Sequence, residues 1–88
     1  MDTRARIAWN LRRLRIAQRI TQENLAVDAA IDRTVVSDLE RGKHNPSVDL
    51  LDRLASALSV DISVFFSEPL PGDKEPETLK AGRKPKNN

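Results

Sequence analysis

Residues 21–42 read TQENLAVDAAIDRTVVSDLERG and are more informative than any other part of the chain. Thr21 and Asp32 can each accept hydrogen bonds from the free amides of a first helical turn, so each is a candidate N-cap. Gly42 stands where a residue in the left-handed region commonly closes a helix. The spacing therefore predicts one helix directly after Thr21 and a second over about 33–41.

The apolar residues of this stretch fit two crossing helices that share one inner face. They are Leu25, Ala26, Ala29, Ile31, Val36 and Leu39. Helices this short are marginal in isolation, so other helices must cover them. Two capped helices joined by a tight turn are the layout of a DNA-reading helix-turn-helix.

The flanking sequence predicts three further helices, and hence an all-α domain of five helices. Apolar residues at helical spacing place a first helix over about 4–18, with Ile7, Leu11 and Leu14 on its inner face. Ser47 caps a fourth helix, and Asp61 caps a short fifth helix over 62–66. The inner stripe of the fourth helix is expected to comprise Val48, Leu51, Leu54, Ala55 and Leu58.

The composition changes after the fifth helix. Residues 67–88 read SEPLPGDKEPETLKAGRKPKNN and contain four of the five prolines. This stretch cannot bury enough apolar surface to fold by itself. We therefore expect a DNA-binding domain over 1–66, followed by an irregular Pro/Lys-rich tail over 67–88 that is flexible or loosely docked. Its basic run at 81–86 is either a minor-groove arm or a solvated extension.

The composition of the 88 residues excludes several classes of function. The absence of cysteine removes disulfides, cysteine-ligated zinc and thiol catalysis. A single histidine and the lack of a phosphate-binding glycine loop disfavour an enzyme, and we predict no catalytic residue, metal or cofactor. No apolar run approaches the roughly 20 residues of a membrane span. We expect a cytoplasmic protein, associated with the nucleoid when bound to DNA, with no small-molecule effector evident.

The charge is unevenly distributed. Although the net charge is only +2, residues 3–20 contain six arginines and no acid. Such a block indicates a polyanionic partner, and a solvated basic helix face is the alternative.

Four motifs in order make the chain resemble a known family. They are ITQENLA at 20–26, LERGKHNPS at 39–47, LDRLASALSV at 51–60 and the FF pair ending at 66. Together they are similar to the phage-repressor and Cro type of helix-turn-helix regulator, the XRE family. The resemblance spans about 7–66. It implies a five-helix domain whose third helix enters the major groove, usually as a dimer on a palindromic operator.

The resemblance implies that four residues on the outer face of the third helix read bases. They are Arg33, Thr34, Ser37 and Asp38. A guanidinium can donate bidentately to guanine, a carboxylate can accept from cytosine, and a threonine methyl can pack on thymine. Arg33 can instead bind phosphate only, and Asp38 can pair with Arg41 one turn on. Thr34 and Ser37 can simply be solvated helix residues.

Contacts to the sugar-phosphate backbone are also implied. Gln22 stands at a helix N-terminus, whose amides attract phosphate, and Arg41 and the loop after it can reach the backbone. The loop residues are Lys43, His44 and Asn45. Each of these can equally be a plain surface residue, and nothing arranged around His44 in the sequence favours catalysis.

A structural ion pair is implied between Arg15 of the first helix and Glu40 of the ERG motif. If both side chains are buried, removing one costs about 3–5 kcal/mol. An exposed pair would contribute about 0–1 kcal/mol.

Two positions depart from the family pattern. Ala30 occupies a turn position often held by glycine, so either it is left-handed at a cost of about 1–2 kcal/mol or the turn has another shape. Asp38 places an acid on a surface expected to face phosphates.

Apolar residues left outside the predicted core favour a homodimer interface. They are Leu50, Val64, Phe65 and Trp9, of which Trp9 can instead dock the tail. The sequence therefore predicts a regulator of transcription that binds double-stranded DNA sequence-specifically, with DNA and a second copy of the chain as its partners. The alternative is an adaptor or antitoxin-like module that keeps the fold and uses its apolar surface to bind a protein.

Overall fold

The computed structural model describes residues 1–69, and these residues are helical without strands. The elements are α1 (Thr3–Ala17), α2 (Gln22–Ala29), α3 (Arg33–Glu40), α4 (Val48–Leu58) and the 3-10 helix η1 (Ile62–Phe66). The all-α prediction is confirmed, with one correction: the fifth helix is a single stretch of 3-10 helix, so the described residues contain four α-helices. None of these helices is both long and apolar enough to cross a bilayer.

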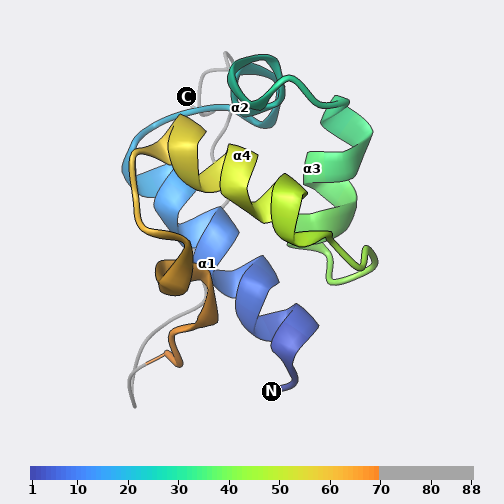
Figure 1. Cartoon of the computed structure of the whole chain (residues 1–88), viewed down its shortest axis with the longest axis vertical. Coiled ribbons are helices and arrows are strands. Elements are labelled where there is room, and N and C mark those ends of the chain that lie inside the picture. Colours follow the sequence, from blue (N-terminus) through green and yellow to red (C-terminus); the bar gives the residue numbers. More distant parts are fainter. Residues whose placement is uncertain (70–88) are drawn as a thin grey trace, which may run out of the picture.

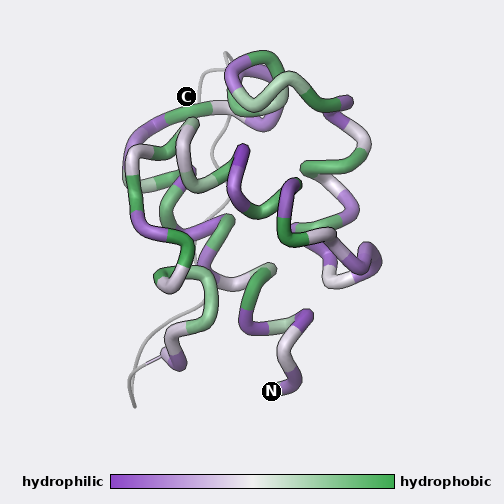
Figure 2. The backbone as a smooth tube through the Cα atoms, in the orientation of Figure 1, coloured by the Kyte–Doolittle hydropathy of each residue, from purple (hydrophilic) through white to green (hydrophobic). Residues whose placement is uncertain are grey.

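The helices surround one core, and α1 runs through the middle of the molecule (Figure 1). It contacts η1 along its N-terminal half and also packs on α3, while α2 packs on both α3 and α4. Each helix carries hydrophilic and hydrophobic residues side by side (Figure 2), so each can turn one face inward and another outward. The inner face of α3 therefore packs against α1 and α2 and its opposite face points away from them.

Side-chain caps are present at four of the five helix starts, three of them at the predicted residues Thr21, Ser47 and Asp61. Asp2, Thr21 and Ser47 each accept a hydrogen bond from the amide three residues later, at 2.9–3.0 Å, and Asp61 accepts from the Ser63 amide at 3.0 Å. Asp32 precedes α3 in extended conformation, but its side chain makes no capping bond. The Val35 amide donates to the Asp32 carbonyl instead, which occupies the donor that the side chain would have capped.

The turn between α2 and α3 contains a left-handed alanine. Ala30 has φ 60° and ψ 46°, and the Ile31 amide donates to the Ala26 carbonyl at 2.9 Å, which closes the helix as a Schellman motif. The family's glycine position is therefore left-handed here too, at the cost expected for a residue with a Cβ. Gly42 is also left-handed, with φ 71°, as predicted.

Most of the core is the set that the apolar spacing predicted, with Ala8 and Phe65 in addition. The core comprises Ile7, Ala8, Leu11, Leu25, Ala26, Ala29, Val36, Leu39, Leu51, Leu54, Ala55, Leu58 and Phe65. Leu14 and Ile31 are partly buried against it. Val48 is a correction, because it is 72% exposed. It is the first residue of α4, and helical side chains point back towards the N-terminus, so its side chain extends past the core.

Phe65 is a second correction, since the sequence placed it on a dimer surface and the structure buries it completely. Side chains three residues apart eclipse one another in a 3-10 helix, so Phe65 shares the inward face of η1 with Ile62. Its neighbour Phe66 points outward and is 41% exposed. A surface built from η1 therefore has Phe66 in place of Phe65.

Candidate nucleic-acid interface

The outer face of α3 carries the four predicted base-reading residues. Arg33 and Thr34 are exposed, while Ser37 and Asp38 are half-buried. The opposite face of the helix is fixed in the core by Val36 and Leu39, which have at most 1% of their surface exposed. The four residues therefore share a side of α3 that the core leaves accessible.

Behind this face lies the ion pair between Arg15 and Glu40. Arg15 Nε is 2.5 Å from Glu40 Oε2, and Arg15 Nη2 donates to Glu40 Oε1 at 3.0 Å, so the pair is bidentate. Both side chains are 5% exposed. Arg15 also donates to the Ile20 carbonyl at 2.8 Å. The buried form of the pair, rather than the exposed one, is present, and it ties α1 to the last residue of α3.

Gln22 extends this pair towards the surface. Its Nε2 donates to Glu40 Oε1 at 3.1 Å, and its Oε1 accepts from Arg33 Nη1 at 3.5 Å. A carboxylate on one side and a guanidinium on the other fix which end of the amide is oxygen. Arg15, Glu40, Gln22 and Arg33 thus form a continuous chain from the interior to the outer face of α3, which we call the Arg15–Arg33 chain.

Asp38 is engaged by its own helix. Its Oδ1 accepts from Arg41 Nη2 at 2.6 Å, an i,i+3 contact at the end of α3. The pair with Arg41, one of the two contacts that the sequence left open, is present, and a contact between Asp38 and a base stays a prediction.

The loop after α3 places three polar residues beside this end of the helix. Lys43 and Asn45 are exposed, and His44 is half-buried. The left-handed Gly42 and a bond from the Lys43 amide to the Asp38 carbonyl at 2.9 Å set the direction of the loop. Arg33 therefore lies at the start of α3, Arg41 directly after its last residue, and Lys43 in the loop that follows, and all three are exposed.

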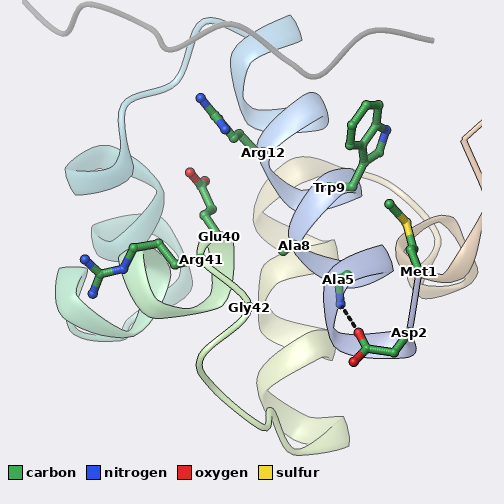
Figure 3. A pocket seen from close by; sticks show the side chains of 9 residues that line it. All are labelled: Met1, Asp2, Ala5, Ala8, Trp9, Arg12, Glu40, Arg41 and Gly42. Carbon is green, nitrogen blue, oxygen red and sulfur yellow. Dashed lines mark hydrogen bonds between the residues drawn. The ribbon is translucent and has the colours of Figure 1, made fainter. Parts of the chain in front are cut away.

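The predicted dimer residues lie on α1, α4 and η1 and not on α3. Leu50 and Val64 are half-buried, with Leu50 packed against the core. Trp9 is half-buried and lines a groove of about 410 Å³ between α1 and the end of α3, together with Met1, Arg12 and Gly42 (Figure 3). The structure describes a single copy of the chain, so the homodimer stays a prediction.

Asn10 is a structural residue that the sequence analysis missed. It is 2% exposed, and its Nδ2 lies 2.7–3.0 Å from the carbonyl oxygens of Arg6, Phe65 and Ser67. These bonds attach η1 and the residues after it to α1. The signal was available, because Asn10 lies three residues after buried Ile7 and therefore on the inner face of its helix.

The described part of the chain offers no site for a metal. Among residues 1–69, no three histidine, aspartate or glutamate side chains are grouped so that they could hold an ion.

Comparison with known proteins identifies the family. A helix-turn-helix family model, HTH_3, matches residues 11–65. The chain belongs to this helix-turn-helix family. The match contains α2, α3 and the turn at Ala30, and it confirms the resemblance to repressor-type regulators.

Members of this helix-turn-helix family with curated names include the immunity repressor of Bacillus phage phi105. It is 31% identical over 62 residues, which cover 70% of this chain and 43% of the repressor. The matched region spans about half the length of that repressor and of a hypothetical transcription factor from Neisseria meningitidis. The names of these relatives, a repressor and a hypothetical transcription factor, agree with the expected class of a regulator of transcription.

Solved structures of the family have the same fold. The restriction-modification controller protein C.AhdI of Aeromonas hydrophila superposes with a TM-score of 0.70 and 35% identity, covering 72% of this chain and 96% of that one. The controller protein C.Esp1396I, solved as a tetramer with its natural 35-base-pair operator, gives a TM-score of 0.69 and 29% identity. That match covers 75% of this chain and 87% of the controller.

Proposed function

We propose that this helix-turn-helix protein is a sequence-specific regulator of transcription that reads the major groove of double-stranded DNA with α3. The observation that carries the proposal is the Arg15–Arg33 chain, which positions an exposed guanidinium at the start of α3. Residues near the start of a recognition helix are the ones that contact base edges in this type of domain.

The chemistry of the outer face fits base recognition. Arg33 can donate two hydrogen bonds to guanine, and the Thr34 methyl can pack on a thymine methyl. Ser37, further along the same face, can donate to or accept from either kind of base. Each well-formed bidentate pair gives about 1–3 kcal/mol of discrimination against the wrong base.

Contacts to the phosphates would fix the register. The N-terminus of α2 carries Gln22 and presents free amides, an arrangement that favours phosphate. Arg41 and the loop residues Lys43, His44 and Asn45 would reach the backbone on the other side of α3. Such contacts position the protein and make its affinity depend on salt.

We further propose that the protein acts in the cytoplasm as a dimer on a palindromic operator. Support comes from C.Esp1396I, a member of the same fold that binds its operator as a tetramer. Leu50, Val64 and the exposed Phe66 would form the two-fold surface, with Trp9 as an additional candidate. Sedimentation at rising concentration tests this surface, and a protein that stays monomeric on its operator would exclude it.

Selection of bound sequences from random duplex DNA at a stated salt concentration tests the function. The wild type should enrich a site with two related half-sites, because a symmetric dimer reads a symmetric operator. Arg33→Ala should lose preference at one base pair in each half-site. Arg53→Ala, which removes an exposed arginine from α4, should keep the wild-type preference and serves as the matched control.

The same selection separates the alternative of a protein-binding module. That alternative expects no enrichment by the wild type and a role for Trp9 and the groove beside it. Enrichment that Trp9→Ala retains and Arg33→Ala loses would exclude it.

A further inference from the structure

Asp38 has an unexpected position for a residue on a DNA-facing surface. Its carboxylate lies on the same side of α3 as Arg33, where a negative charge is repelled by phosphates. The Arg41 guanidinium, with Nη2 at 2.6 Å from Oδ1, compensates that charge. Asp38 therefore reaches this surface as half of an ion pair and not as a bare acid.

The Asp38–Arg41 pair contributes little to the stability of the fold. The side chains of Asp38 and Arg41 are 32% and 58% exposed, and ion pairs open to water to this degree contribute little to folding. The pair therefore acts through the exposed guanidinium of Arg41, which is open to a ligand.

Both the main chain and the side chain of Asp38 determine where Arg41 lies. The Asp38 carbonyl accepts from the Lys43 amide at 2.9 Å, and the Arg41 amide also donates to it at 3.2 Å. These bonds close the end of α3, and left-handed Gly42 completes the turn. Figure 3 shows the Arg41 side chain leading away from α1 and from Glu40. The Asp38 carboxylate thus orients the guanidinium of Arg41, and the backbone of Arg41 is fixed by the hydrogen bond to the Asp38 carbonyl.

A guanidinium held at one N–H group keeps further donors for another ligand. It carries five N–H groups in a rigid planar fork, and the Asp38 contact is made by Nη2. The remaining donors are arranged for a bidentate contact with phosphate oxygens. Holding the fork before binding removes part of the ordering cost that a mobile arginine pays on association.

We propose that Asp38 is a positioning residue that orders Arg41 for the DNA backbone, and that it does not read a cytosine. The inference rests on the proposed function and makes it more specific. It also accounts for the acid at this position, because an acid three residues before Arg41 can hold the guanidinium whereas a neutral side chain would hold it less firmly.

A double-mutant cycle tests the proposal. The full chain and the variants Asp38→Asn, Arg41→Gln and the double variant are titrated with the operator that the wild type selects, at one salt concentration. Asp38→Asn should weaken binding by about 2- to 10-fold, the fold-change that corresponds to ordering one side chain. In the Arg41→Gln background the same change should no longer weaken binding, because there is no guanidinium left to order and only the repulsion between the carboxylate and the phosphates is removed. All four proteins should melt at similar temperatures.

The control is Asp52→Asn, which removes the same charge from an exposed position in the groove between α2 and α4. It should bind like the wild type. Loss of preference at one cytosine on Asp38→Asn, by roughly 5- to 150-fold and in both backgrounds, would mean that Asp38 reads a base and would overturn the proposal. Tighter binding of Asp38→Asn in both backgrounds would overturn it as well, because Asp38 would then act only through repulsion.

Failure of this inference can be told apart from failure of the proposed function. If the wild type enriches no sequence, the function itself is wrong. If the wild type enriches a site and Arg33→Ala loses preference at one base pair of each half-site, while the Asp38 and Arg41 effects add independently, only the positioning role is wrong.

Discussion

Replacing Glu40 by glutamine should destabilise the domain strongly. Glutamine has nearly the same shape and removes only the negative charge, so Arg15 would keep its place with 5% of its side chain exposed and no carboxylate beside it. Breaking a buried pair by removing one member costs about 3–5 kcal/mol, because the charge left behind is uncompensated.

The structure places the expected cost near the lower end of that range. In the variant, Arg15 keeps its bond to the Ile20 carbonyl, which is 2.8 Å long in the wild type. The side-chain carbonyl of the new glutamine can still accept one of the two hydrogen bonds that Arg15 donates to Glu40. We therefore expect a loss of about 3 kcal/mol. For a domain of this size each kcal/mol lowers the melting temperature by about 4–8 °C, so the midpoint should fall by about 12–24 °C.

Thermal and urea denaturation followed by circular dichroism at neutral pH measure this loss. Asp38→Asn is the matched control, since it removes the same charge from an ion pair that is open to water and should cost no more than about 1 kcal/mol. A Glu40→Gln midpoint within about 4 °C of the wild type would refute the reasoning, because the pair would then contribute no more than an exposed one.

Three further substitutions test other parts of the structure. Ala30→Gly should leave DNA binding intact and raise the free energy of unfolding by about 0.5–1 kcal/mol. Glycine removes the strain of a left-handed alanine, and the greater entropy of the unfolded chain offsets part of this gain. A lower melting temperature would contradict this expectation. Asn10→Ala should cost about 1–3 kcal/mol in urea unfolding and speed amide hydrogen exchange in η1 first, because it leaves buried carbonyls without a donor. Hydrogen bonds from the Ser63 hydroxyl and amide lower the pKa of Asp61. Ser63→Ala should raise that pKa towards its ordinary value in an NMR titration. The stabilisation that these bonds give is present above the unfolded-state pKa and is lost as the pH falls through the lowered folded-state pKa, so wild type and variant should converge in acid.

Helix caps and helix-closing turns, which depend on a few neighbouring residues, were the features that the sequence predicted best. A cap acts within three residues, as Thr21 and Ser47 show, and a left-handed closure depends on one residue, as Gly42 shows. Buried positions followed from helical periodicity because the helices share a single core. The pair of Arg15 and Glu40 is 25 residues apart in the chain, and only the family resemblance pointed to it.

The errors have physical causes that the sequence does not display. Phe65 and Phe66 are chemically identical neighbours, and which one is buried depends on whether the segment is an α-helix or a 3-10 helix. Asp32 has the right side chain for a cap, but a backbone carbonyl took its donor. Val48 fits the apolar stripe of α4 by spacing, and it is exposed because the helix begins there. The tail was predicted over 67–88, and its residues 70–88, with the basic run at 81–86, lie outside the described residues.

The Arg15–Arg33 chain becomes weaker from the interior to the surface, and this gradient suits a reading residue. The buried Arg15–Glu40 pair is short, bidentate and costly to break, so it fixes the carboxylate. Gln22 bonds that carboxylate at 3.1 Å and is thereby held in one orientation. Its contact with Arg33 is 3.5 Å long and exposed, at the limit of a hydrogen bond. Under the proposed function, Arg33 would therefore give up little if a guanine replaced Gln22 as its partner, whereas a short, buried contact would first have to be broken.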